Sequence, residues 1–478
     1  MNKENPKKSV KRKIVLWMLV LLGVYFAFLP NRFATSSILD FAKGEPDAPT
    51  DSFDLEGFSR IPVLRGGRVK PIDSVARNAL LVLRNKRTAL DEAGNKIPAI
   101  NWFAEVLFNP EGGDNLKTFL IDHDQVLGLL GKKLSVDGKF FSYKDLEPHL
   151  GEIDSSAREA GKVEQEKRDS FDQNIIELYR SALLYRRSKT TLSPPDPQLA
   201  PEMAEQLQVA DIMFDPEKDN DLTAEYARFR KLTQELSSRP EDIRMGSADF
   251  AKVVFFLDYY SRMNLWSEFF AIPPEKNDPK KQWRSIGESL VGKEPLDSKE
   301  KQKMDPSRFA STLQELVSME PNSLAARLLQ IRENQKMDPT ALFASQYAEA
   351  IKLRREVDPV LGLYEKLKAS YLDKDYTTFN QTVAELRKVG TERAGGDAST
   401  LEFEKIYNGF EPFYRSSIAY VLIFLIAGVS WLAATYSTTL GRKGETARLL
   451  RNAAYILTAI VLLSHTFGLA GRMYIEGR

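Results

Sequence analysis

The chain has 478 residues, with 67 Lys and Arg against 66 Asp and Glu, three histidines and no cysteine. A net charge of +1 argues against a nucleic-acid-binding protein, which is usually strongly basic, and a mean hydropathy of −0.34 excludes a chain embedded in a membrane throughout. The lack of cysteine excludes disulfides, thiolate metal sites, CxxC redox pairs and the CxxCH haem-attachment motif.

The N-terminus joins a basic tail to an apolar segment. Residues 1–13 carry six Lys and Arg against one Glu, and residues 14–30, IVLWMLVLLGVYFAFLP, carry no charge. An apolar run of this length spans a bilayer with help from its flanking residues, so it predicts a first transmembrane helix. A cleaved signal peptide has the same pattern, and that alternative stays open. Both interpretations place the following residues outside the cytoplasm.

The exported region begins with a linker and a basic turn. Residues 31–57 are rich in Pro, Ser, Asp and Gly, which is typical of a linker. Residues 58–77, FSRIPVLRGGRVKPIDSVAR, predict a short extended segment, a tight glycine turn with positive φ, and a helix capped by Asp73 or Ser74.

Four cations make this turn basic within an acidic region: Arg65, Arg68, Lys70 and Arg77. They are candidates for an anion or partner patch that would hold carboxylates, lipid head groups or haem propionates. The alternative is a solvated turn with structural ion pairs, and the residues alone leave both open.

The pattern after residue 98 is mainly helical, with a possible short strand at Lys139–Phe141 and a clear apolar helical face within residues 152–190. The stretch SPPDP at residues 193–197 breaks this pattern. It therefore divides the exported region into subdomain A, residues 58–192, and subdomain B, residues 193–415.

Subdomain B is also expected to be helical. The aromatic-rich residues 253–272 contain three charges, which favours a buried core helix over a fourth membrane span. Asp338–Pro339 predicts a helix start with an N-cap followed by proline. Residues 399–402, STLE, fit a capping box before the last helix of the exported region.

Two apolar runs close the chain, at residues 416–436 and 453–470, and both predict transmembrane helices. The loop between them, residues 437–452, carries a net +3, and short basic loops stay in the cytoplasm. The basic N-terminus and this loop therefore share one side, which leaves residues 31–415 and the tail, residues 471–478, outside.

The near-neutral net charge is the sum of positively charged cytoplasmic segments and a negatively charged exported region. The two cytoplasmic segments carry +5 and +3 and the outer tail +1, so the remainder carries about −8. The predicted fold class is mainly α, with three transmembrane helices and a large, predominantly helical extracytoplasmic domain between the first and the second.

The common catalytic and nucleotide-binding motifs GxxxxGK[ST], GxGxxG, HExxH and GxSxG are absent, and no catalytic residue or metal site is predicted. His123 and His149 are interpreted as a loop and a helix-end residue. His465 lies in an otherwise apolar span, where an ionisable group is costly. Because imidazole is a common axial ligand of haem, His465 is the candidate cofactor-binding residue. The alternative is a histidine hydrogen-bonded to a neighbouring helix.

Several stretches carry a resemblance in combination: IPVLRGGRVKPIDSVAR at residues 61–77, IYNGFEPF at 406–413, LSHTFGL at 463–469 and RMYIEGR at 472–478. They resemble the IPV-x-x-GGR…KP…AR stretch, the YN-x-x-x-PF start of the next span, and the following helix with its Arg-rich exit in System II cytochrome c biogenesis proteins of the CcsA/ResC type, in the large form with an exported insert. The resemblance covers about residues 58–150 and 400–478.

This resemblance implies haem as cofactor and a multi-pass location in the bacterial plasma (inner) membrane, with the bulk of the chain periplasmic. It also implies a ResB/CcsB-type subunit, apocytochrome c and an external thiol reductant as partners. The family acts as a cytochrome c synthase (haem lyase) through a Trp-rich WWD segment, whereas the five tryptophans here are never adjacent. We therefore expect the N-terminal portion of a truncated or split protein, and whether this chain is itself an enzyme stays open. The alternative function is a non-catalytic membrane-anchored scaffold with an exported helical protein-binding domain.

Overall fold

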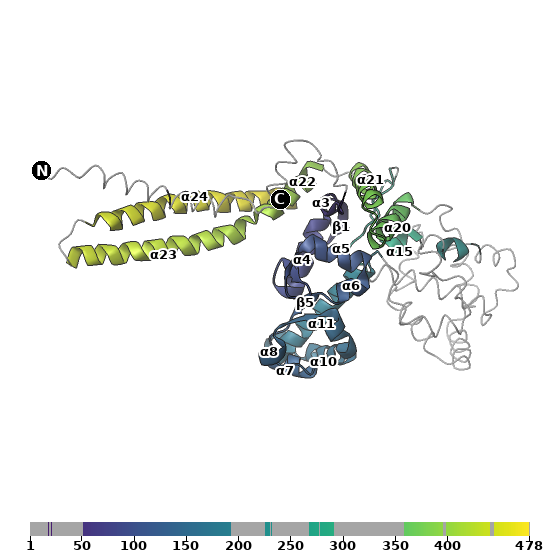
Figure 1. The fold of residues 1–478 in the computed structure, drawn as a ribbon, viewed down its shortest axis with the longest axis horizontal. Coiled ribbons are helices and arrows are strands. Elements are labelled where there is room, and N and C mark those ends of the chain that lie inside the picture. Colours follow the sequence, from purple (N-terminus) through teal and green to yellow (C-terminus); the bar gives the residue numbers. More distant parts are fainter. Residues whose placement is uncertain are drawn as a thin grey trace. The chain divides into compact units, whose positions relative to one another are not determined.

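The computed structural model is mainly helical (Figure 1). It divides into two compact units, Ala48–Gly396 and the combination of Met1–Asp47 with Asp397–Arg478. We call the described part of the former the globular unit, and the described residues after Asp397 the helix-hairpin unit. The structure describes residues 18, 21, 51–192, 225–229, 231, 267–276, 278–290, 358–394, 398–439 and 444–477.

The globular unit opens with a short helix and a β-hairpin. Helix α3 (Leu55–Ser59) is capped by Asp54, whose side chain accepts a hydrogen bond from the Gly57 amide. Strands β1 (Pro62–Arg65) and β2 (Arg68–Pro71) pair antiparallel. The two residues between them, Gly66 and Gly67, have φ of 60° and 75°. Two consecutive positive φ values match the twist of a two-residue hairpin, and the predicted extended segment and glycine turn are confirmed.

The predicted cap of the next helix is wrong. Helix α4 (Ile72–Arg84) begins directly after Pro71, which is its N-cap residue without a side-chain cap. Asp73 and Ser74 already lie inside the helix, and the Asp73 carboxylate accepts from Arg77 one turn later. The prediction was wrong because the helix begins directly after Pro71, and the buried Asp73 carboxylate pairs with Arg77 instead of capping the helix.

A small antiparallel sheet follows, of which the sequence indicated only the last strand. Its strand order is β4-β3-β5-β6. Strands of three or four residues are too short for a clear alternating pattern, which is why the stretch was expected to be mainly helical. The strands are β3 (Thr88–Leu90), β4 (Lys96–Pro98), β5 (Lys117–Leu120) and β6 (Phe140–Ser142).

Helices precede, interrupt and follow these strands along the chain. The long stretch at residues 152–190 is two helices, because the chain breaks at a 3₁₀ turn, Gln165–Lys167, before a capping box that starts α11 at Asp169. The helices are α5 (Ala99–Phe108), α6 (Pro110–Asp114), α7 (Asp124–Leu129), α8 (Leu134–Asp137), α9 (Tyr143–Leu146), α10 (Leu150–Lys162) and α11 (Ser170–Thr190), with a further 3₁₀ turn at Glu147–His149.

The core centres on helix α5, whose Trp102 and Phe103 are fully buried. The indole Nε1 of Trp102 donates to the Thr118 hydroxyl at 3.1 Å, so the one polar atom of this side chain has a partner. The burial of large aromatic side chains supplies most of the stabilisation of such a unit.

Segments distant in sequence complete this core. Helices α20 (Pro359–Leu372) and α21 (Tyr376–Ala394) form a hairpin that contacts α5 and α3, and a short helix, α15 (Ile286–Leu290), precedes them. Phe53 stacks on Tyr371 with ring centroids 4.6 Å apart. The Asn380 side chain accepts from the Asp54 amide at 2.7 Å, so α21 holds the start of the globular unit.

The helix predicted at residues 253–272 lies outside the described residues up to residue 266, and its described end is wrong. Phe270 exchanges two backbone hydrogen bonds with Leu64 of β1, at 3.1 and 2.9 Å. Ile272 does the same with Arg284, at 3.0 Å each. The chain is extended here because the edge of β1 offers backbone partners that a helix could not reach.

The helix-hairpin unit contains α22 (Ala398–Phe410), α23 (Pro412–Thr439) and α24 (Glu445–Glu476). Glu411 separates α22 from α23 with φ of 47°. The predicted capping box at Ser399 is wrong, because α22 already includes Ala398; both Ser399 and Thr400 lie within 3.5 Å of the Tyr474 hydroxyl instead. The predicted helix start at Asp338–Pro339 lies outside the described residues.

Candidate functional site

The predicted basic patch lies on the β1–β2 hairpin and the start of α4. Arg65 and Arg68 are directly opposite each other at the turn, and Lys70 is opposite Val63. Like charges facing across two strands destabilise a hairpin unless other groups compensate them. Partners for at least two of the four cations are therefore expected.

Arg65 has such a partner in Glu268, which lies in the extended segment beside β1. The guanidinium forms an ion pair and a hydrogen bond with the buried carboxylate, and the Glu268 amide donates to the Thr191 hydroxyl at 2.9 Å. Burial raises the pKa of Glu268, and the nearby charge of Arg65 opposes that rise. Arg65 thus ties the hairpin to a segment about two hundred residues later in the chain.

Arg77 is also paired. Its Nε lies 3.0 and 2.9 Å from the two carboxylate oxygens of Asp73, whose side chain is buried. Arg68 donates to the Val69 carbonyl at 3.4 Å, and both Arg68 and Lys70 are half-buried. The hairpin therefore combines two structural ion pairs, at Arg65 and Arg77, with two flanking cations.

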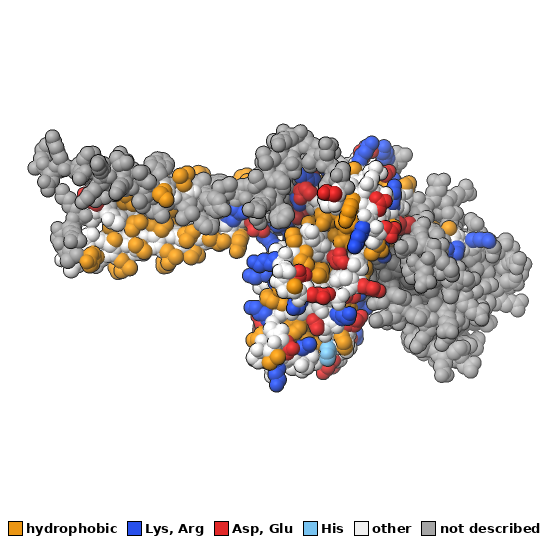
Figure 2. Space-filling view, in the orientation of Figure 1, with side chains coloured by type: hydrophobic (Ala, Val, Ile, Leu, Met, Phe, Trp, Pro, Cys, Tyr) orange, Lys and Arg blue, Asp and Glu red, His pale blue; other side chains and the backbone are white. Residues whose placement is uncertain are grey.

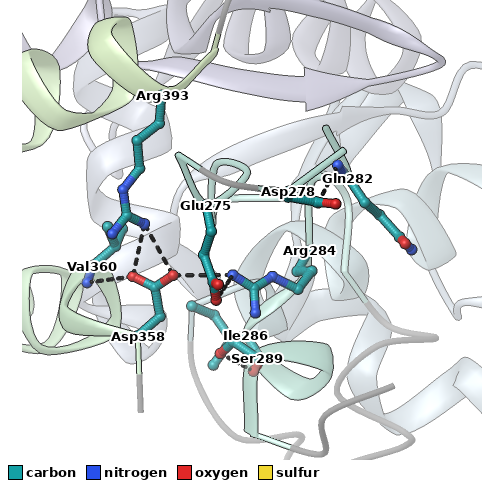
Figure 3. A network of polar contacts seen from close by, with 9 residues as sticks. All are labelled: Glu275, Asp278, Gln282, Arg284, Ile286, Ser289, Asp358, Val360 and Arg393. Carbon is teal, nitrogen blue, oxygen red and sulfur yellow. Dashed lines mark hydrogen bonds and ion pairs between the residues drawn. The ribbon is translucent and has the colours of Figure 1, made fainter. Parts of the chain in front are cut away.

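A polar cluster that sequence reasoning missed surrounds Asp358 (Figure 3). One carboxylate oxygen accepts from the Val360 amide at 3.1 Å, and both accept from Nη1 of Arg393 at 3.0 Å. Nη2 of Arg284 lies 3.0 Å from the second oxygen and 3.3 Å from Glu275. The carboxylate is buried. It joins the start of α20, the end of α21 and the segment before α15, and we call this cluster the Asp358 clasp.

The clasp is built for holding rather than for proton transfer. All the donors around Asp358 converge on its two oxygens, and a buried carboxylate that is satisfied in this way has little capacity left for a substrate. The sequence signal that could have found it is the Asp358–Pro359 pair before an apolar helix, because an N-cap aspartate followed by proline marks a helix start.

The helix-hairpin unit has the composition of a membrane segment. Helices α23 and α24 are long and apolar enough to cross a bilayer, and at about 1.5 Å per residue both exceed a hydrocarbon core of about 30 Å. The membrane span predicted at residues 14–30 lies outside the described residues apart from Met18 and Leu21, which are helical and exposed. Figure 2 shows many hydrophobic side chains on the visible part of these helices, and the exposed large apolar residues include Phe424, Trp431 and Leu463.

Helix α24 contacts α23 along a seven-residue repeat. A repeat of seven favours left-handed packing of two helices along one seam, and small residues on that seam allow close approach in a membrane. Two series of buried residues recur every seven positions, namely Ala447, Ala454, Val461, Gly468 and Ile475, and Leu457, Ser464 and Gly471.

Two glycines on this seam receive a tyrosine from α22. The Tyr407 hydroxyl donates to the Gly468 carbonyl at 2.8 Å. A Cβ at Gly471 would lie 2.8 Å from the Tyr407 ring, and one at Gly468 would lie 3.1 Å from Pro412. Only glycine leaves room for these contacts, and the ring therefore locks α22 against α24.

The candidate cofactor residue His465 lies beside this seam and is half-buried. Its ring faces the edge of Phe413, with centroids 5.5 Å apart, and lies 6.0 Å from Tyr420. Both aromatic residues belong to α23. The nearest arginine along the helix, Arg472, pairs with Glu476 at 3.1 Å. The His465 imidazole thus lies beside two aromatic rings of α23, which would suit an axial ligand next to an apolar wall.

The other two histidines end up at helix starts. His123 and His149 are the N-cap residues of α7 and α10, and neither makes a side-chain cap. Among the residues that the structure describes, no group of three or more His, Cys, Asp or Glu could hold a metal ion. No protein-family model matches the chain, and no curated protein matches it.

Proposed function

We propose that this chain is the N-terminal portion of one component of the membrane machinery that delivers haem to apocytochrome c. In this proposal three helices cross the bacterial inner membrane, and residues 31–415 lie in the periplasm. The bilayer, a ResB/CcsB-type subunit, apocytochrome c and an external thiol reductant are its partners. The resemblance of its four stretches to the CcsA/ResC type motivates the assignment.

One observation carries the proposal. Two of the stretches that resemble the family, residues 406–413 and 463–469, are brought into contact with each other. Tyr407 donates to Gly468, and Phe413 faces His465. Stretches shared with a family for functional reasons are expected to meet in space, and here they meet beside the histidine of the apolar run at residues 453–470.

In this role His465 would hold haem through its imidazole, and Phe413 and Tyr420 would orient the ring. Bound haem iron supplies the redox chemistry, whereas the protein supplies an axial ligand and an apolar wall. With one such ligand, the purified chain is expected to bind haem weakly and to depend on a partner for the rest of the site.

The test has a spectroscopic and a cellular arm. Deletion of the gene from its host should abolish haem staining of c-type cytochromes, and the wild-type gene and the Thr466→Val variant should restore it, whereas His465→Ala should not. Thr466 is the matched control because it is the exposed neighbour on the same helix. Normal cytochrome maturation in the deletion strain would refute the proposal. A stoichiometric Soret band from the chain alone, lost in His465→Ala, would overturn the expected weak binding.

A second candidate, a non-catalytic scaffold, is favoured by the ion pairs of the basic hairpin. Arg65 and Arg77 have structural partners, and the half-buried Arg68 and Lys70 beside them are the cations that would contact an acidic partner. Reversal of charge at Arg68, as Arg68→Glu, should then abolish recovery of the partner subunit in a pull-down. Recovery at the wild-type level would count against the scaffold.

A further inference from the structure

The six strands of the globular unit contain five Lys and Arg and no Asp or Glu. This bias stands out in a region that is acidic as a whole. We propose that the outer face of the four-stranded sheet, together with the adjoining corner at α8, docks on an anionic lipid surface. The proposal rests on the membrane anchoring proposed above and adds a second contact with the bilayer.

The register of the sheet defines its outer face. Leu90 is opposite both Lys96 and Lys117. Residues directly opposite one another point to the same side of a sheet, so these side chains share one face. Their neighbours Ala89 and Phe141 are buried on the other side, against the core. The outer face therefore carries two lysines around a half-buried leucine.

A β-bulge extends this face. The register shifts between Lys117 and Phe119, and Thr118 and Phe119 are both fully buried. A bulge re-aims side chains in this way, and it leaves Leu120 and its opposite residue, Phe140, on the outer face. The face thus combines half-buried apolar side chains with cations.

The lysines of this face differ from two paired lysines, one at the end of α10 and one in the 3₁₀ turn that follows it. Lys162 and Lys167 pair with glutamates one helical turn away. Lys96, Lys117 and Lys139, in contrast, make no ion pair among the residues that the structure describes. Lysines that form no ion pair with a carboxylate are available to an external anion.

Two cations, Arg84 and Lys139, contact the ring of Phe140. The Arg84 guanidinium lies 4.4 Å from the centroid of the Phe140 ring, and Lys139 lies 5.7 Å from it. Arg84 is itself buried and donates to the Thr88 carbonyl. A ring stacked on a fixed guanidinium keeps its orientation, so the apolar centre of this face is preorganised.

The corner before β6 adds an apolar tip. Val136 on α8 is 80% exposed and Leu134 is 40% exposed, and Lys132 and Lys133 precede them. Gly131 and Gly138 flank the corner with φ of 65° and 73°, which fixes the turn that presents it. An exposed valine that follows two lysines in the chain suits a contact with the lipid head-group boundary.

Lipid is the occupant that satisfies both halves of this surface. A soluble acidic peptide offers carboxylates to the lysines, but a bilayer offers phosphates for the lysines and an apolar interior for Val136. A hollow beside the tip is lined by Asp124, Lys132 and Lys133 among others. Lys132 lies 3.9 Å from Asp145, so Lys133 is the lysine of this hollow that a head-group phosphate would meet. Anchoring by α23 and α24 keeps the bilayer close, so a weak contact suffices.

The absence of cysteine permits a direct test with the full chain. The Val136→Cys variant carries an environment-sensitive fluorophore and is reconstituted into vesicles with a spin-labelled phospholipid. Quenching is expected to be about threefold stronger with about one third phosphatidylglycerol than with phosphatidylcholine alone, and to weaken in about 0.5 M salt, because salt screens exposed charges. A fluorophore at Gln381→Cys, an exposed residue of α21, should show little quenching in either lipid.

Charge reversal provides the matched comparison. Lys96→Glu with Lys117→Glu and Lys139→Glu should remove the difference between the two lipids. The same change in charge at three helix positions, Lys162→Glu, Lys167→Glu and Lys388→Glu, should leave the difference intact.

The outcomes separate this inference from membrane anchoring itself. A chain that floats with vesicles after an alkaline wash, but whose Val136 fluorophore is not quenched, overturns the docking surface and keeps the anchoring. A chain that fails to float refutes both. Shielding of Val136→Cys from alkylation in native membranes, without quenching in pure lipid, overturns lipid docking in favour of a protein partner.

Discussion

The globular unit and the helix-hairpin unit use the same apolar residue types in opposite places. In the globular unit, large side chains such as Trp102 and Phe119 are fully buried. In the helix-hairpin unit the large side chains face outward, with Trp431 70% and Phe424 75% exposed, and the buried seam of α24 is rich in Ala, Gly and Ser. The difference shows how the surroundings decide which side chains are buried. Water drives large apolar side chains into a core, whereas a bilayer accepts them on the surface and leaves close packing of small residues as the main attraction between helices.

Polar groups follow the same division. The globular unit buries full charges and satisfies them across long sequence distances, as Asp358 does with Arg284 and Arg393. Between α23 and α24 the contact uses short neutral donors, such as the Ser430 hydroxyl, which lies 2.8 Å from the Ala447 carbonyl. A charge needs a dense set of partners, which two helices alone do not supply.

The strongest test of this comparison removes the charge at the clasp. Asp358→Asn leaves the buried guanidinium of Arg284 and the half-buried one of Arg393 without their shared carboxylate, which should destabilise the globular unit by about 3–5 kcal/mol. Thermal unfolding in detergent and limited proteolysis would measure this. Glu275→Gln, at the half-exposed edge of the same cluster, is the control and should cost below about 1 kcal/mol. Equal effects of the two variants would show that the clasp does not hold the unit together.

An intermediate effect is expected at the glycine seam. Gly471→Ala places a Cβ 2.8 Å from the Tyr407 ring, and such overpacking costs about 1–3 kcal/mol. Gly428→Ala on α23 is the matched control, since a Cβ there meets nothing within 4 Å. The first variant should lower the melting temperature of the helix-hairpin unit, and the second should leave it unchanged or raise it. A harmless Gly471→Ala would mean that small residues do not define this seam.

The smallest effect concerns the hairpin turn. Gly67 has φ of 75°, and Gly67→Ala should cost about 1 kcal/mol because an L side chain is strained there. Gly128→Ala in α7 has room for a Cβ and no positive φ, so it should stabilise by about 0.4–1 kcal/mol. Chemical unfolding followed by tryptophan fluorescence would compare them. The same sign for both variants would contradict the assigned turn.

Local patterns predicted local features well. Gly66–Gly67 predicted a tight turn because few residues other than glycine adopt positive φ readily, and uninterrupted apolar runs predicted α23 and α24. Patterns failed where a partner elsewhere in the chain decided the outcome. Asp73 was expected to cap α4 and instead holds Arg77, and Ile272 was expected in a helix and instead pairs with Arg284.

In the candidate site, too, the sequence indicated the residues and the tertiary structure supplied their neighbours. His465 stood out in the sequence because an ionisable residue in an apolar run is rare, but Phe413 and Tyr420 became its neighbours only through the packing of α23 on α24. Arg65 and Arg77 stood out as a basic patch, and their carboxylate partners came from a distant segment in one case and from the same helix in the other.

The sequence by itself determined the mainly helical class, the two apolar helices, the glycine turn and the lack of any thiol chemistry, because each depends on residue type or on neighbours within a few positions. Only the tertiary structure decided the four-stranded sheet, the Asp358 clasp and the insertion of Tyr407 between Gly468 and Gly471. These features join residues tens to hundreds of positions apart. Their free energy comes from burial and pairing that no short stretch of sequence contains.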